Sequence, residues 1–240
     1  MGSEQAHADD ARSALLAALP EPGRQLILST ARSHTFQRGE RLARHGDDAQ
    51  ALFILESGCV AVRLSTPNGE SVTLSVLGVG AVFGEVGLFS YPAERTATVQ
   101  ALDDVAAIVL RREDFSRLRE SHPEVNDFVM QLMARRVDRL SHLLAEALYL
   151  PVDRRIARRL YEVGRLYARA ATPLALPLTQ DEVAQIAGTT RPTANQALKK
   201  LEAGGVVQLS RGRIVIADLA DAQQSAPSAH PRLRAACAWG

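Results

Sequence analysis

Short apolar runs separated by glycines and other turn residues dominate the chain from about residue 34 to residue 110. Their spacing of roughly eight to twelve residues is typical of an all-β sandwich or barrel. A turn is expected at Thr66–Gly69, and two short helices, Ala11–Leu19 and Gln25–Ala31, precede the strands. The pattern predicts a compact β-barrel or jelly-roll-like domain. The runs that we expect to form strands are Phe36–Gly39, Arg41–Gly46, Leu52–Gly58, Val60–Leu64, Val72–Leu77, Thr96–Ala101 and Val105–Leu110.

A long helical pattern follows Pro123, since Glu124–Leu150 contains neither Gly nor Pro. Apolar residues recur in it at alternating spacings of three and four, the a/d pattern of a coiled coil. A helix of about 25 residues would be roughly 37 Å long, too long to be covered by one small barrel. We therefore expect this seam to pair two copies of the chain; the alternative is a helix buried within its own chain. The seam residues are Met130, Met133, Val137, Leu140, Leu144 and Ala147.

The pattern after Pro151 is helical again and ends in a small hairpin. Asp153–Tyr167 is amphipathic, and Ala171–Thr179 is a connector punctuated by prolines. Two helices separated by a three-residue turn containing Gly, followed by a hairpin, are typical of a winged helix-turn-helix. The residues from 222 to 240 are expected to be a disordered tail. The helices of the motif are Gln180–Ala187 and Pro192–Ala203, and its hairpin strands are Val206–Leu209 and Arg213–Ile216.

The second of these helices places polar side chains where a DNA major groove would lie. Arg191 is the candidate for bidentate recognition of guanine, and Gln196 can pair with adenine. Thr190 is expected to cap the helix. A plain helical hairpin with a solvated polar face is the alternative. The other candidate DNA-binding residues are Thr193 and Asn195 on the same face, Lys199, Lys200, Arg211 and Arg213 as phosphate contacts, and Thr179 and Gln180 at the start of the motif.

The charge of the chain is divided between its two parts. Residues 1–150 carry 15 Arg and 20 Asp or Glu, a net charge of −5, whereas residues 151–240 carry 13 Lys or Arg and 7 Asp or Glu, a net charge of +6. A basic second part favours a polyanionic partner, because phosphate neutralisation supplies most non-specific nucleic-acid affinity. No apolar run approaches the roughly 18 to 20 residues of a membrane helix, and the polar N-terminus shows no export signal. We expect a cytoplasmic protein that binds double-stranded DNA and no membrane.

A second dense motif lies at Gly80–Ala101, with the sequence GAVFGEVGLFSYPAERTATVQA. Gly84 permits close backbone approach, and a short helix starting at Val86 offers amides to an anion. Arg95 supplies a forked cation and Thr96 a hydroxyl donor. Glu85 can accept a hydrogen bond from a ribose hydroxyl. A 3′,5′-cyclic nucleotide has one free ribose hydroxyl and one singly charged phosphate, and these side chains match both.

These motifs together resemble the Crp/Fnr family of transcription regulators over roughly residues 30–220. FQRGERLARHGD and LFILESGCVAV are similar to its cyclic-nucleotide β-roll, FGEVGLF with ERTA to its phosphate-binding cassette, and TQDEVAQIAGTTRPTANQALKKLE to its helix-turn-helix. The resemblance implies an α+β fold with a cyclic-nucleotide-binding domain at 1–122, a dimerisation helix at 123–150 and a DNA-binding domain at 151–221. It also implies a homodimer, a palindromic DNA site and contact with RNA polymerase.

The resemblance also implies roles for the cassette. Glu85 would bind the ribose, and Arg95 and Thr96 the cyclic phosphate, beside Gly84 and Val86. Arg136, Leu140 and Ser141 would approach the ligand from the dimer helix.

Three departures from the family pattern keep the effector and the DNA site open. Leu140-Ser141 stands where cyclic-AMP receptors carry a Thr-Ser pair, so cyclic AMP, cyclic GMP and cyclic di-GMP all remain candidates, as does activity without ligand. Pro192 and Gln196 replace a Glu and an Arg, so a different half-site is expected. A regulatory subunit of an enzyme is the alternative of another class. No catalytic motif and no metal-ligand spacing is visible.

Overall fold

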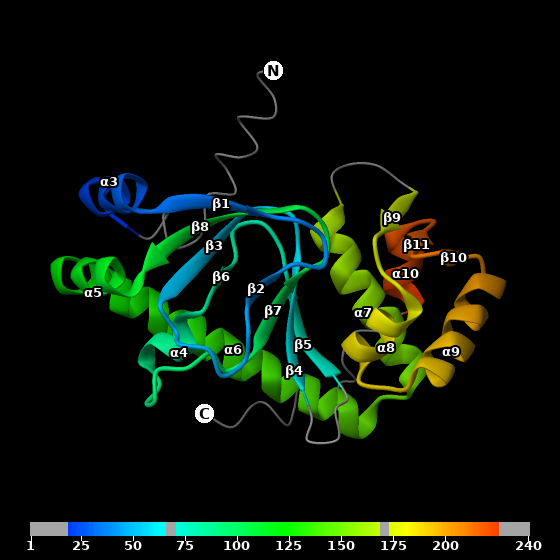
Figure 1. Cartoon of the computed structure of the whole chain (residues 1–240). Helices are drawn as coiled ribbons and strands as arrows, with labels where there is room; N and C mark the ends of the chain where they lie inside the picture. The colour runs from blue at the N-terminus through cyan, green and yellow to red at the C-terminus, as the bar shows by residue number, and fades with distance from the viewer. Residues whose placement is uncertain (1–18, 66–70, 169–172, 226–240) are drawn as a thin grey trace, which may run out of the picture. The chain divides into compact units, whose positions relative to one another are not determined.

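The computed structural model describes residues 19–65, 71–168 and 173–225, which form an α+β fold (Figure 1). By their internal contacts these residues divide into two compact units. The division falls between Arg136 and Val137, inside the long helix α6 (Glu124–Tyr149), and not at Pro151. The helices expected at 124–150 and at 153–167 are confirmed, the second as α7 (Val152–Tyr167).

The strands of the first unit form two antiparallel four-stranded sheets. Their orders are β1-β8-β3-β6 and β2-β7-β4-β5, so neighbours in space are mostly distant in sequence. Three helices accompany the sheets: α3 (Glu21–Thr30), α4 (Glu85–Phe89) and α5 (Arg112–Ser121). The strands are β1 (Arg32–Phe36), β2 (Arg41–Ala43), β3 (Ala51–Ser57), β4 (Val60–Ser65), β5 (Ser71–Leu77), β6 (Val82–Phe83), β7 (Thr98–Ala101) and β8 (Val105–Arg111).

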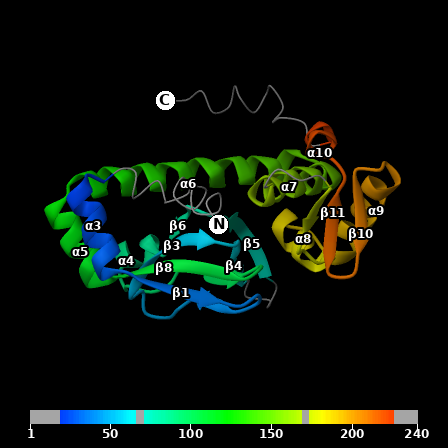
Figure 2. The ribbon, with the colours of Figure 1, turned by 90° about the horizontal axis from the view of Figure 1, so that it is seen from above.

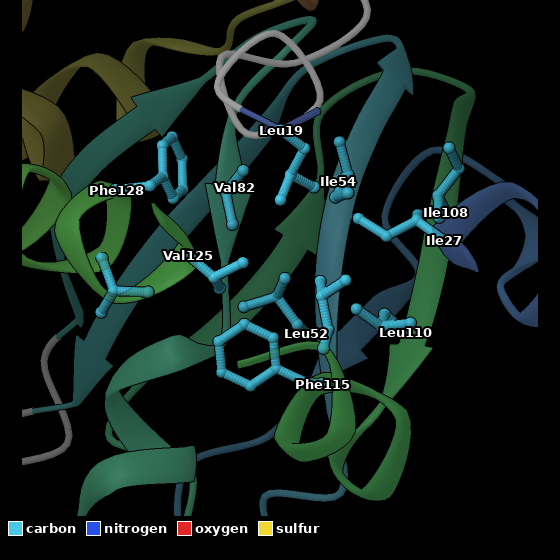
Figure 3. Packing of buried hydrophobic residues seen from close by; sticks show 12 residues of the cluster. Leu19, Ile27, Leu52, Ile54, Val82, Ile108, Leu110, Phe115, Val125 and Phe128 are labelled. Carbon is cyan, nitrogen blue, oxygen red and sulfur yellow. The ribbon is translucent and has the colours of Figure 1, made fainter. Parts of the chain in front are cut away.

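Strand β3 lies at the centre of this unit because both of its faces are buried. Leu52 and Ile54 belong to one apolar cluster, with residues of α3, α5, α6 and β8. Figure 3 shows this cluster, in which Phe115 of α5 and Val125 of α6 converge on Leu52. Phe53 and Leu55, on the opposite face, belong to a second cluster that includes residues of β2, β4 and β7. The alternation of a strand therefore builds a helix layer on one side and a second sheet on the other.

The second unit consists of helices around a small three-stranded sheet of order β10-β11-β9 (Figure 2). Ile156, Leu160 and Val163 of α7 are buried, which explains the amphipathic pattern of that helix. Gly164 on α7 lies so close to α10 that a Cβ there would be 2.7 Å from Leu219 Cδ2. The remaining elements are β9 (Leu174–Leu176), α8 (Gln180–Ala187), α9 (Arg191–Ala203), β10 (Val207–Ser210), β11 (Arg213–Ile216) and α10 (Leu219–Ser225).

Charged side chains fasten the second half of α6 to α7 across Pro151. Glu146, which is 3% exposed, forms ion pairs with Arg158 at 2.9 Å and with Arg159, which is 5% exposed. Glu162 joins Arg159 to Arg139 of α6, with 3.1 Å between Arg139 Nη2 and Glu162 Oε2. These positive charges outweigh burial and hold the pKa of Glu162 below its usual value. The ion pairs explain why residues 137–149 belong to the same unit as α7.

Several expectations from the sequence are wrong in detail. The run Phe36–Gly39 is not a strand, because β1 ends at Phe36 and a turn follows in which the Glu40 amide donates to Gln37 O. The connector contains strand β9, which pairs with β11. The expected tail begins too early, because α10 continues to Ser225. Strand β6 and helix α5 were not foreseen. The helix expected at Ala11–Leu19 lies outside the described residues except for Leu19, and the turn at Thr66–Gly69 and the rest of the tail lie wholly outside them.

Candidate functional site

The turn between β6 and α4 forms one wall of the first candidate site. Gly84 has φ = 92°, a left-handed conformation that favours glycine. A Cβ at this position would lie 2.5 Å from Arg95 Nη1 and 3.0 Å from the Ala51 carbonyl oxygen. Gly84 therefore serves both functions that its position in the motif suggested: it turns the chain and lets the Arg95 guanidinium approach the backbone.

Glu85 follows this turn and is fully buried. Its Oε1 lies 2.9 Å from Arg136 Nη1, and its Oε2 accepts a hydrogen bond of 3.2 Å from Arg136 Nη2, which also donates to the Val82 carbonyl. The Oε1 contact is an ion pair without hydrogen-bond alignment, so this oxygen has no hydrogen-bond partner among the described residues. Burial raises the pKa of Glu85, although the charges of Arg136 and Arg95 oppose this. The carboxylate can accept one further hydrogen bond.

Arg95 is a buried cation, 8% exposed, and no carboxylate of the described residues forms an ion pair with it. Its Nη1 donates to the Gly84 carbonyl at 3.2 Å, and its guanidinium lies 5.2 Å from the centroid of the Phe53 ring. Burial lowers the pKa of Arg95, and the nearby charge of Arg112 lowers it further. Because buried charges are normally paired, this guanidinium is suited to an anionic ligand. The hydroxyl of Thr96 belongs to an exposed side chain next to it.

The cavity between these groups has a volume of about 40 Å³. Small-molecule sites usually enclose roughly 300 Å³ or more, so a nucleotide fits only when the side chains of Arg95 and Arg136 move. The polar residues lie against an apolar wall from β2, β4, β6 and β7, which sequence reasoning missed although strand alternation could have indicated it. The lining residues are Ala43, Val62, Phe83, Gly84, Val86, Gly87, Arg95, Thr96, Ala97, Val99 and Arg136.

The structure thus brings six of the eight expected ligand residues together. Gly84, Val86, Arg95, Thr96 and Arg136 line the cavity, and Glu85 contacts Arg136. Leu140 and Ser141 are not among the lining residues. Both are exposed on α6, and the Ser141 hydroxyl donates to the Val137 carbonyl at 2.9 Å. Their expected role towards the ligand remains a prediction.

The second candidate site is the helix pair α8 and α9. Thr179 caps α8 in a capping box with Glu182, and Gly188, with φ = 60°, ends it. Ala184 is 2% exposed and Ala194 and Ala197 are 0% and 5% exposed, and these small side chains let the two helices pack closely. Arg155 of α7 donates to the Gly188 carbonyl at 3.4 Å and supports the turn. The helix-turn-helix expected from the sequence is confirmed.

The outer surface of α9 carries the polar side chains that the sequence placed there. Lys200, expected to contact phosphate, pairs with Asp153 of α7 at 3.1 Å, and this contact lowers the pKa of Asp153. The expected capping by Thr190 is wrong: its hydroxyl makes no cap bond and instead lies 2.9 Å from the Thr193 hydroxyl. Gln180, Thr193 and Asn195 are half-buried. The exposed candidates are Arg191, Gln196, Lys199 and Lys200 on α9, and Arg211 and Arg213 on the hairpin.

Two further searches covered the same residues of the structure. No helix within 19–65, 71–168 and 173–225 is long and apolar enough to cross a membrane. Within these ranges no group of three or more His, Cys, Asp or Glu side chains could hold a metal ion.

Comparison with known proteins assigns both sites to known domain types. Residues 33–122 match the model of the cyclic nucleotide-binding domain, and residues 154–221 match the Crp-like helix-turn-helix domain. The chain is 28% identical over 186 residues to a CRP-like cAMP-activated global transcriptional regulator of Mycobacterium tuberculosis, covering 76% of this chain and 83% of the relative. It is also 28% identical over 198 residues to the cAMP-activated global transcriptional regulator CRP of Salmonella typhimurium, covering 82% and 94%.

Solved structures show the same fold. A c-di-GMP responsive global regulator of Xanthomonas campestris superposes with a TM-score of 0.71 at 21% identity, over 83% of this chain and all of the other. The relatives are transcription regulators and not enzymes. With a cyclic-nucleotide-binding β-roll, a long helix and a Crp-like helix-turn-helix in one chain, the protein is a DNA-binding transcription regulator and belongs to the Crp/Fnr family.

Proposed function

We propose that the protein is a homodimer whose sequence-specific binding to DNA is controlled by a cyclic nucleotide, cyclic AMP in the first place, bound in the cavity at Gly84. The observation that carries this proposal is the pair of unsatisfied groups there. Arg95 is a buried cation with no ion-pair partner among the described residues, and Glu85 Oε1 is a buried acceptor without a donor in the same part of the chain. A cyclic phosphate and a ribose 2′-hydroxyl satisfy one each.

The geometry favours a cyclic mononucleotide over cyclic di-GMP. The cavity presents one guanidinium without an ion pair among the described residues and one carboxylate, which matches one phosphate and one free ribose hydroxyl. The relatives from M. tuberculosis and S. typhimurium are named as cAMP-activated, which supports cyclic AMP, whereas the X. campestris regulator is described as c-di-GMP responsive. Cyclic GMP shares the phosphate and ribose and is the second candidate.

Calorimetric titration of the full chain with cyclic AMP, cyclic GMP and cyclic di-GMP tests the effector. We expect a cyclic mononucleotide to bind with one site per chain. Binding of cyclic di-GMP alone would contradict the assignment of ligand class. No heat with any of the three at two temperatures would contradict control by a nucleotide and leave a regulator that acts without this ligand.

Nucleotide binding can reach DNA only through a difference in affinity between two states of the dimer. Arg136 belongs to the cavity and to α6, so its release from Glu85 on ligand entry acts directly on that helix. Glu146 and Arg139 of the same helix pair with α7, which begins the DNA-binding unit. We therefore place the coupling in α6 itself and not in a flexible joint at Pro151.

Dimerisation through α6 follows from an exposed apolar stripe. Met130, Val137, Leu140, Leu144 and Leu148 are between 51% and 67% exposed, at spacings of seven, three, four and four residues. This is a coiled-coil seam without a partner in the described part of the chain. A two-fold dimer that carries two recognition helices implies a palindromic site. RNA polymerase is the candidate protein partner, and the cytoplasm the place of action.

Leu144→Asp is expected to make the protein monomeric. Two leucines are lost per dimer at about 1.5–3 kcal/mol each, which weakens association by at least roughly 100-fold. Sedimentation equilibrium measures this. Arg135→Asp is the matched control, because Arg135 is exposed and lies about 160° around the helix from Val137. A Leu144→Asp protein that remains dimeric at micromolar concentration would rule out this seam.

Arg191→Ala is expected to reduce sequence preference more than general DNA affinity. Loss of a bidentate contact to guanine costs about 1–3 kcal/mol on the specific site and relaxes the preference at one position. Fluorescence anisotropy with a duplex selected from a random library, and with random duplex, measures both affinities. Lys199→Ala, an exposed neighbour on α9, is expected to weaken both equally. Equal loss for Arg191→Ala would make Arg191 a phosphate contact.

A further inference from the structure

Residues 46–50 hold the backbone of Arg95 in place. The Gly46 amide donates to the Arg95 carbonyl at 2.9 Å, and the Arg95 amide donates to the Asp47 carbonyl at 2.7 Å. Two residues further, the Ala49 amide donates to the Ala93 carbonyl at 2.9 Å. Both backbone groups of Arg95 are thus bound to this segment. The direction of its guanidinium into the cavity therefore depends on where residues 46–50 lie.

Arg112, at the start of α5, fixes that segment from the other side. Its Nε and Nη2 both donate to the Ala49 carbonyl, at 2.9 and 2.6 Å, and its backbone amide donates to the Gln50 carbonyl at 2.8 Å. No ion pair of the described residues includes Arg112. A half-buried guanidinium spent on a backbone carbonyl is a structural clamp, because its fork satisfies an acceptor that no other described group reaches.

Ala49 also touches the cassette directly. It is fully buried, and a Cβ at Gly87 of α4 would lie 2.6 Å from the Ala49 Cβ and 2.5 Å from the Glu94 carbonyl oxygen. A shift of Ala49 therefore changes the position of α4 and of the residue before Arg95. The carbonyl that Arg112 binds is at the point where segment 46–50, α4 and residues 93–95 meet.

Arg112 contributes a second effect through its charge. It lies near enough to Arg95 to lower the pKa of that guanidinium, the largest contribution after burial. An anion bound by Arg95 relieves this repulsion and is attracted by both charges. Since the Arg112 donors are used by Ala49, its contribution to the anion is one of field and not of direct contact.

We propose that Arg112 is a positioning residue of the anion site: it clamps Ala49 so that Arg95 faces Gly84, and it adds a second positive charge behind the phosphate position. That the anion is a nucleotide phosphate rests on the proposed function; the clamp itself does not. The residue acts through Arg95 and is not expected to touch the ligand.

Hydrogen exchange of the full chain without ligand tests the clamp. Arg112→Gln is expected to speed exchange of the Gly46, Ala49 and Arg95 amides by at least about 10-fold, while the amides of β3 and β8 remain protected. Arg111→Gln is the matched control, because the neighbouring Arg111 is exposed and loses the same charge. Unchanged exchange at the three amides, or a rise throughout the first unit, would overturn the positioning role.

Calorimetry with cyclic AMP tests the consequence for the ligand. Arg112→Gln is expected to weaken binding about 10- to 100-fold, as loss of a supporting contact does in other sites. Arg112→Lys retains the charge but not the fork, and its affinity should fall between that of Arg112→Gln and the unmodified chain. Equal affinity of Arg112→Gln and the unmodified chain would overturn the proposal. If the unmodified chain binds no nucleotide, the proposed function fails and hydrogen exchange alone decides the clamp.

Discussion

Arg95→Ala is expected to abolish nucleotide binding and to leave the first unit folded. Hydrogen bonds to a charged group contribute about 1.5–3 kcal/mol each, so loss of a forked pair to the phosphate weakens binding by more than roughly 100-fold. The fold should be little affected for a specific reason. Arg95 forms no ion pair among the described residues, so its removal strands no buried carboxylate, and only the bond to the Gly84 carbonyl is lost. The free energy of unfolding should change by about 1 kcal/mol.

Two measurements on the same sample separate these effects. Calorimetric titration with cyclic AMP gives the affinity, and urea denaturation gives the free energy of unfolding. Arg44→Ala is the control, since Arg44 is an exposed arginine of the segment that precedes Gly46. Retained affinity in Arg95→Ala would refute the site, whereas lost affinity together with a large loss of stability would show that Arg95 is a structural residue.

Glu146→Ala is expected to destabilise the second unit by about 3–5 kcal/mol, the usual cost of breaking a buried ion pair from one side. The substitution leaves Arg159 buried with only Glu162 as partner, and it also removes the carboxylate that pairs with Arg158. The stability of α7 on α6 should suffer first, because these ion pairs join the two helices across Pro151.

Urea denaturation followed by circular dichroism measures this loss. Asp138→Ala is the control on the same helix: Asp138 is 70% exposed and lies 3.6 Å from His142 only, so the change should be within about 1 kcal/mol. Similar stability of Glu146→Ala and the control would show that the cluster is solvated in solution and does not fasten α7 to α6.

The helix-turn-helix was predictable because its determinants are local. Thr179 with Glu182 and the glycine at 188 mark the ends of α8, and small residues at helical spacing mark the crossing with α9. The cassette was predictable for a similar reason, since Gly84, Glu85 and Arg95 lie within twelve residues and each has a distinct chemistry. Side-chain type and spacing carried this information, and the resemblance to the family completed it.

Other features depend on contacts that no local pattern encodes. Arg112 and Ala49 are 63 positions apart, and nothing in either segment shows that a guanidinium meets that carbonyl. The ion pairs of Glu146 with α7 depend on how the chain turns at Pro151, so the sequence placed the boundary there. Strands β6 and β9 have two and three residues, too few for alternation to show. The small volume of the cavity follows from the side-chain positions of Arg95 and Arg136, which spacing does not determine.

The coupling between effector and DNA is tested most directly by one titration. The affinity of the full chain for a selected duplex is measured by fluorescence anisotropy at fixed salt, without nucleotide and with saturating cyclic AMP or cyclic GMP. Control of DNA binding from the cavity at Gly84 predicts that one of the two nucleotides changes this affinity by at least about 5-fold. The same affinity under all three conditions would contradict it.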